Sequence, residues 1–328
     1  MNISFLIEKP LIILTPVQLP RLNRLTGLAW WRRGPAERDD SDASRLRQED
    51  LIRQMIHRPG PCAMGKIGTS ELLMLEHAHR YIRLPWPPAA SWCRPTRRLY
   101  HSGGLFPIEQ ATFQRFVLEY PAAIRALDLV TQWQLGGTFE AALESALIDR
   151  LCPRAVRVGY YFLRILNPRA PWLDDLAKLR WLVIHPFEKT IRAQLPHLAE
   201  LGVYSESARG DLAHRARDTA ILACPQLPYM VPPRHRDWFE ALEDLKSRME
   251  KIDYEIALVG AGAWSLPLVA HAKAMGKKGM HLGGSLQLMF GIKGGRFDNN
   301  RIYNPRWTRP LPQESPANHR LMEGGAYW

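Results

Sequence analysis

Cysteine is scarce in this chain of 328 residues. Its four cysteines lie far apart and form neither a Cys-x-x-Cys pair nor the cysteine and histidine spacing of a zinc knuckle; they are Cys62, Cys93, Cys152 and Cys224. This spacing argues against a disulfide framework and against a structural zinc site. We therefore expect a protein of a reducing compartment, the cytoplasm.

Long apolar runs are also missing. No stretch approaches the roughly 20 apolar residues that span a bilayer. The apolar segment 5–19 is interrupted by Glu8, Lys9 and two prolines and has no basic start, so it does not resemble a signal peptide. The cluster Trp30-Trp31-Arg32-Arg33 is compatible with peripheral contact to a membrane surface, although side-chain packing explains it more simply.

Acidic residues are fewer than basic ones, with 32 Asp and Glu against 44 Lys and Arg and a formal net charge of +12. Such an excess attracts polyanions. The basic residues are spread along the chain rather than gathered on one helix or tail, which argues against nucleic acid as the partner. An anionic nucleotide fits the same charge.

The chain does contain apolar segments of strand length that alternate with helical segments from residue 179 onward. We expect strands at 181–185, 219–224, 255–260 and 279–282, and helices at 188–201, 236–251 and 264–275. This alternation predicts an α/β fold with a parallel, Rossmann-like sheet covered by helices on both faces. Ligands of such sheets bind at the carboxyl ends of the strands.

The segment before residue 179 predicts a smaller α/β lobe. It contains expected helices at 46–56, 72–81, 108–127 and 138–151, strands at 62–68 and 129–133, and a proline-rich loop at 84–95. The predicted organisation is thus an irregular N-terminal arm and loop (1–45), an N-terminal α/β lobe (46–178) and a C-terminal nucleotide-binding lobe (179–328). The aromatic and glycine-rich tail 323–328 is expected to dock back on the body.

Glycines stand at the ends of two expected strands, at Gly260 and Gly262 and at Gly283 and Gly284. A strand-to-helix turn of this kind offers backbone amides and a helix dipole to a phosphate. A tight turn without a ligand explains it equally well. Ser265 replaces the third glycine of a dinucleotide fingerprint, so the support for NAD is weak.

The segment 283–296 holds two cations, Lys293 and Arg296, between glycines. We expect a long loop in which both cations and several amides converge on a diphosphate. The alternative is a flexible crossover loop without a ligand.

Two further candidates lie at strand ends. In the junction from Gly68 and Thr69 to Glu71, the carboxylate could bind a divalent metal or act as a base, although an acidic residue in the first turn of a helix is common for dipole reasons alone. His185 directly follows an expected strand, where it could contact a phosphate or serve as a base. A histidine satisfied within the protein is the equal alternative.

In order and pattern, about two thirds of the chain resembles the bacterial glycosyltransferases of the GT-D fold. Their N-terminal junction reads roughly Arg-Phe-Gly-Asp-Gly-Glu, and here the corresponding stretch is Lys66-Ile67-Gly68-Thr69-Ser70-Glu71. Their C-terminal part has a Gly-Pro-Thr-Ala turn and a strand ending in Asp-Ile-Gly, which correspond to 260–263 and 281–283. The loop 290–298 and the ending 323–328 instead suggest an uncharacterised branch associated with surface polysaccharides.

The resemblance implies a glycosyltransferase that takes a sugar from a nucleotide-diphosphate donor and passes it to a glycan, lipid-linked or protein acceptor. Glu71 and His185 would be its catalytic candidates. Thr69 and His281 replace two acidic residues of the family, so Glu71 is the one candidate ligand for Mn²⁺ or Mg²⁺. The alternatives are another nucleotide-dependent enzyme, such as a dehydrogenase or methyltransferase, or a non-catalytic binding or assembly protein on the same fold.

Overall fold

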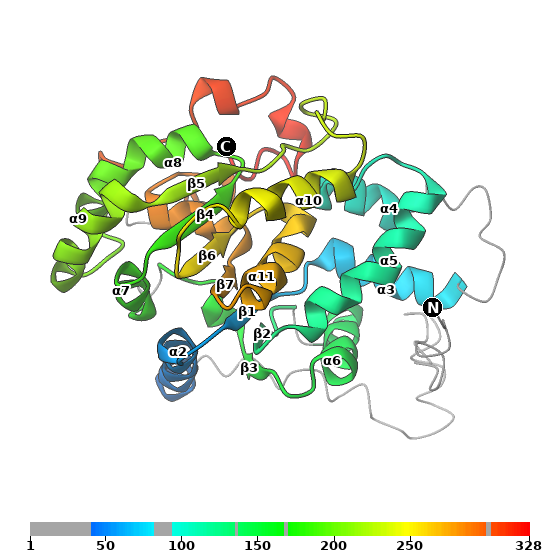
Figure 1. The fold of residues 1–328 in the computed structure, drawn as a ribbon, viewed down its shortest axis with the longest axis horizontal. Helices are drawn as coiled ribbons and strands as arrows, with labels where there is room; N and C mark the ends of the chain where they lie inside the picture. Colours follow the sequence, from blue (N-terminus) through cyan, green and yellow to red (C-terminus); the bar gives the residue numbers. More distant parts are fainter. Residues whose placement is uncertain (1–40, 82–93, 135–136, 167–169, 300–302) are drawn as a thin grey trace.

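Short apolar segments form the strands of a single sheet. The computed structural model describes residues 41–81, 94–134, 137–166, 170–299 and 303–328. Within these ranges seven strands are all parallel, in the order β3-β2-β1-β7-β6-β4-β5 (Figure 1). Their bounds are β1 (Cys62–Lys66), β2 (Leu129–Thr131), β3 (Val156–Val158), β4 (Trp181–His185), β5 (Ala220–Ala223), β6 (Ile256–Val259) and β7 (Lys278–His281).

Helices cover both faces of this sheet, each face with its own apolar core. Every residue of β4 and β6 is buried, which explains why these strands read as continuous apolar runs. One face carries α3 (Thr69–Tyr81), α5 (Gln110–Arg125), α6 (Phe139–Leu151), α10 (Trp238–Met249) and α11 (Ser265–Ala274), and the other carries α2 (Asp42–His57), α7 (Trp172–Ala177), α8 (Glu188–Gln194) and α9 (Arg209–Asp218). The predicted Rossmann-like α/β fold is confirmed.

Some elements differ from the prediction. The expected helix 188–201 ends as an α-helix at Gln194 and continues as a 3-10 helix (Leu195–Glu200), because Pro196 has no amide hydrogen to donate. The segment expected as the first part of a long loop forms a 3-10 helix (Gly283–Phe290) whose apolar side chains are buried. β3, α7 and α9 were not predicted, since they are short or largely polar.

Strands from both expected lobes belong to the one sheet. β1, from the N-terminal half, pairs with β7, from the C-terminal half, with Cys62 opposite Lys278 and Met64 opposite Met280. Most of the expected N-terminal arm, including Trp30 and Trp31, and most of the proline-rich loop lie outside the described residues. None of the described helices is long and apolar enough to cross a membrane.

Adjacent strands β4 and β6 send their connections to opposite faces. β4 leads into α8, whose Ile191 packs in one core, whereas β6 leads into α11, whose Leu266 packs in the other. A crevice opens at the carboxyl ends of two strands that diverge in this way, and it is where doubly wound sheets bind ligands. Here His185 and Gly260 stand at that point.

Candidate functional site

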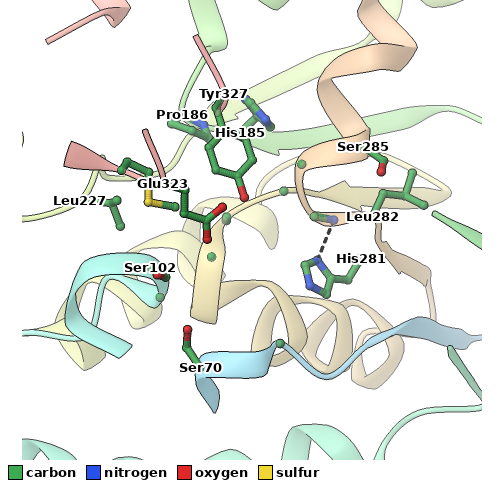
Figure 2. Close-up of a pocket in the computed structure, with 18 of the residues that line it drawn as sticks. Ser70, Ser102, His185, Pro186, Leu227, His281, Leu282, Ser285, Glu323 and Tyr327 are labelled. Carbon is green, nitrogen blue, oxygen red and sulfur yellow. Dashed lines mark hydrogen bonds between the residues drawn. The ribbon is translucent and has the colours of Figure 1, made fainter. Parts of the chain in front are cut away.

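A cavity of about 480 Å³ lies at the carboxyl ends of the strands (Figure 2). It is lined by residues at or just after the ends of all seven strands: Lys66, Trp133, Tyr160, His185, Cys224, Gly260 and His281. Further walls come from α4 (Arg94–Arg98), from a π-helix (Leu99–Gly103) and from the C-terminal segment. The sheet thus brings residues that are far apart in sequence to one place.

Nearly all of the residues singled out in the sequence line this cavity: Gly68, Thr69, Glu71, His185, Gly260, Gly262, His281, Gly283, Gly284 and Arg296. Lys293 does not line it. Its ammonium lies 5.4 Å from the centroid of the Tyr303 ring, and its amide donates to Thr308 O. In this structure Arg296 lines the cavity, whereas Lys293 lies outside its lining.

The glycines of the site are closely approached by the protein itself. A Cβ on Gly284 would collide with the Tyr327 ring, and one on Gly262, where φ is +55°, would lie 3.0 Å from Gly103 O. In the turn after β6, the amide of Ala261 already donates to Ser265 Oγ at 2.9 Å. Other parts of the protein occupy the space beside these glycines. The capacity of the site to hold an anion therefore rests mainly on its cationic side chains.

Lys66 is the cation of this cavity best suited to bind an anionic ligand. Its ammonium lies 4.0 Å from the centroid of the Trp133 ring, and no hydrogen bond or ion pair of this group is found with the described residues. Burial lowers the pKa of Lys66, and the charge of Glu71 partly opposes that shift. A desolvated ammonium without a counter-ion in contact is well suited to bind an anionic ligand.

Glu71 sits in the first turn of α3 with its side chain buried. Burial raises its pKa, while a hydrogen bond from its own amide and the charges of Lys66 and Arg98 oppose the shift. A carboxylate with a raised pKa near a cavity is a candidate to accept a proton from a bound hydroxyl. The cavity lining thus combines a carboxylate that can accept a proton, Glu71, with the cationic side chains of Lys66 and Arg98.

The two histidines of the cavity are held neutral. Burial lowers the pKa of both His185 and His281 to about 3. His185 Nδ1 accepts the amide hydrogen of Phe187 at 3.1 Å, which leaves the proton on Nε2. His281 Nδ1 lies 3.2 Å from Val259 O and 3.3 Å from Gly283 N. At neutral pH these side chains can orient a ligand by hydrogen bonding but are poor proton acceptors.

Within the described part of the chain, Glu71 is not joined by further acidic, histidine or cysteine ligands for a divalent metal. Among the residues that the structure describes, no three His, Cys, Asp or Glu side chains gather to hold one. The hydroxyl of Thr69 accepts a hydrogen bond from Gln134 Nε2 at 2.9 Å, so it is engaged within the protein.

Three lining residues were not among the predicted site residues: Lys66, Arg98 and Trp133. Lys66 had a signal that could have been read, since it is the one charged residue of β1, an otherwise apolar and buried strand, and it ends that strand at the binding edge. Trp133 had a similar signal, since it is the last residue of the strand expected at 129–133. Arg98 had none, because only the packing of α4 brings it to the cavity.

The C-terminal segment forms one wall of the cavity. In Figure 2 the Glu323 carboxylate and the Tyr327 hydroxyl point into it from the side opposite Ser70. The Arg296 guanidinium forms an ion pair with Glu323 and lies 4.6 Å from the centroid of the Tyr327 ring. Comparisons with protein families, with curated proteins and with solved structures give no match for this chain.

Proposed function

We propose that this protein is a glycosyltransferase that moves a sugar from a nucleotide-diphosphate donor to a glycan, lipid-linked or protein acceptor, in the biosynthesis of surface polysaccharide or another glycoconjugate. One observation carries the proposal: a cavity at the switch point of a parallel sheet is lined by the Lys66 ammonium, which has no ion-pair partner among the described residues, by the exposed Arg98 guanidinium and by the buried Glu71 carboxyl, whose pKa is raised. Such a cavity suits a diphosphate leaving group beside a hydroxyl acceptor.

In the proposed reaction the acceptor hydroxyl oxygen bonds to the anomeric carbon of the donor sugar. The bond from that carbon to the diphosphate oxygen breaks, and the electron pair leaves with the diphosphate. Lys66 and Arg98 would neutralise the charge that develops there, and the Glu71 carboxylate would take the acceptor proton. His185 and His281, which stay neutral, would hold the ligands by hydrogen bonds.

The first experiment measures thermal stabilisation of the protein by UDP-, GDP-, dTDP- and CMP-sugars, NAD, S-adenosylmethionine and a short DNA duplex, each with and without manganese. The proposal expects stabilisation by one class of nucleotide-sugar, followed by release of the nucleotide when an acceptor is added. Stabilisation only by NAD, S-adenosylmethionine or DNA would contradict it and identify the corresponding alternative. Binding of a nucleotide-sugar without turnover would support the non-catalytic alternative.

Lys66→Met tests the anion site itself. The change removes the charge but keeps the length and apolar character of the side chain, so we expect the affinity for the nucleotide to fall about tenfold or more. The matched control is Lys178→Met, since Lys178 pairs with Asp175 and does not line the cavity. Calorimetric titration with the nucleotide found in the first experiment would measure both. Equal affinities for Lys66→Met and wild type would contradict the assignment.

A further inference from the structure

Glu323 has an unusual backbone conformation. Its φ is +47°, and it is the one non-glycine residue with a positive φ in the described part of the chain. Gly324 and Gly325 follow with φ of +71° and +83°. A non-glycine residue keeps a backbone in the left-handed region only when the contacts around it require this conformation. Residues with such a backbone gather at functional sites.

The contacts that hold this conformation lie directly after it. Gly295 N donates to Trp328 O at 2.9 Å, Arg296 N donates to Ala326 O at 3.1 Å, and Trp328 Nε1 donates to Glu314 O at 2.9 Å. The Trp328 ring lies 5.4 Å from that of Phe187. The end of the chain is therefore anchored, and the left-handed turn aims the Glu323 carboxylate back at the cavity.

The partner of this carboxylate is a cation of the cavity. Lys66, Arg98 and Arg296 all line it, and of these only Arg296 has an ion-pair partner among the described residues, Glu323. The charges of both Arg296 and Glu323 are felt at Lys66. Glu323 thus occupies, with a single negative charge, a place where cations from three elements face one cavity.

We propose that Arg296 and Lys66 form an oligophosphate subsite whose occupant in the ligand-free protein is the Glu323 carboxylate, and that a bound diphosphate displaces Glu323 from Arg296. A diphosphate carries more charge than a carboxylate and can bind a guanidinium through two oxygens, so it competes well for Arg296. Binding must break the existing pair, which lowers the apparent affinity. The inference rests on the proposed function only for the identity of the natural ligand.

Inorganic pyrophosphate is the probe. Calorimetric titration of the full chain should show that Glu323→Gln binds pyrophosphate about 3- to 10-fold more tightly than wild type, because the competing charge is gone while the side-chain length is kept. Arg296→Gln should bind pyrophosphate at least about tenfold more weakly than wild type. Asp298→Asn is the matched control: Asp298 pairs with Arg309 at 2.7 and 2.8 Å in the neighbouring turn, outside the cavity, and its loss should not change the affinity.

Relief of the backbone strain at position 323 is a second way in which pyrophosphate binding can become tighter. The variant Glu323→Gly separates this effect from the effect of removing the charge. Glycine accepts the positive φ and also lacks the carboxylate. Equal gains in Glu323→Gln and Glu323→Gly indicate charge competition, whereas a gain confined to Glu323→Gly would overturn the proposal. Thermal unfolding of each variant without ligand confirms that it is folded.

The proposal falls if wild type does not bind pyrophosphate, if Glu323→Gln binds it no better than wild type, or if Asp298→Asn gains as much. These outcomes are distinguishable from failure of the proposed function. Pyrophosphate binding that depends on Glu323, without turnover of any nucleotide-sugar, would keep the subsite and remove the glycosyltransferase. Turnover of a nucleotide-sugar together with an unchanged pyrophosphate affinity in Glu323→Gln would keep the glycosyltransferase and remove the subsite.

Discussion

Burial gives several side chains of this protein properties that their identity alone does not indicate. Lys66 and Glu71 belong to one strand-to-helix junction, and burial desolvates both side chains. The cost of desolvating a charge shifts the pKa of the lysine down and that of the carboxyl up. Their chemistry therefore depends on depth in the fold, which the sequence of the junction does not show.

Glu144 on α6 provides a measurable case. It is fully buried, its Oε2 accepts the amides of Trp133 and Gln134 at 3.1 and 3.2 Å, and burial raises its pKa from 4.5 to about 7. The Glu144 carboxyl thus has a higher pKa in the folded than in the unfolded protein. The stability that its protonated form contributes below pH 4.5 is therefore lost as the pH rises through about 7. Glu144→Gln keeps the acceptor and lacks this loss, so we expect it to gain about 2–3 kcal/mol relative to wild type between pH 4.5 and 8.

Denaturant unfolding of wild type and Glu144→Gln at both pH values measures this gain. Glu140→Gln, which makes the same change in net charge on the same helix at a partly exposed position, is the control. A stability difference between Glu144→Gln and wild type that is the same at pH 4.5 and pH 8 would contradict the prediction.

At the scale of elements, helix α8 depends on a residue far along the chain. The buried Glu314 carboxylate accepts the amides of Lys189 and Thr190 at 2.7 and 2.9 Å and also the Thr190 hydroxyl. It thereby caps the start of the helix that follows β4. The same segment accepts the indole hydrogen of Trp328, so the cap and the anchored tail form one unit beside the cavity.

Glu314→Ala should therefore lower the free energy of unfolding by about 2–3 kcal/mol, because it leaves buried amides without an acceptor. Glu188→Ala is the control in the same first turn of α8. Within the described ranges, the one ion pair of Glu188 is a surface pair with Arg192, and we expect a loss of about 0.5 kcal/mol or less. Denaturant unfolding of both variants measures the difference, and similar losses in the two would show that the cap contributes little.

At the scale of the whole molecule, the sheet joins the two halves of the chain. β1 pairs with β2 on one side and with β7 on the other, so the lobes expected at 46–178 and 179–328 share a continuous layer. The two cores also run across the division: Leu75 and Leu266 pack in one, and Ile52 and Met280 pack in the other. Each half thus contributes apolar side chains to both cores, and separating the halves would expose them to water.

A chain divided between Leu179 and Arg180 should therefore give fragments that do not unfold cooperatively when separate. Co-expressed, they should associate, because the β1 and β7 edges and both cores are complementary. Size-exclusion chromatography and thermal unfolding of the separate and the mixed fragments measure this. A cooperative transition in either separate fragment would contradict the prediction and support independent domains.

The sequence by itself determined the α/β class, the positions of the longer elements and the edge of the sheet where the site lies, because these follow from local patterns: apolar runs of strand length, helical periodicity and glycines at strand ends. Only the tertiary structure decided that Lys66 and Arg98 reach the cavity while Lys293 does not, and that the Tyr327 ring packs on Gly284 and the Gly103 carbonyl lies close to Gly262. These contacts arise from pairing and packing between segments far apart in the chain, and local sequence patterns do not indicate them.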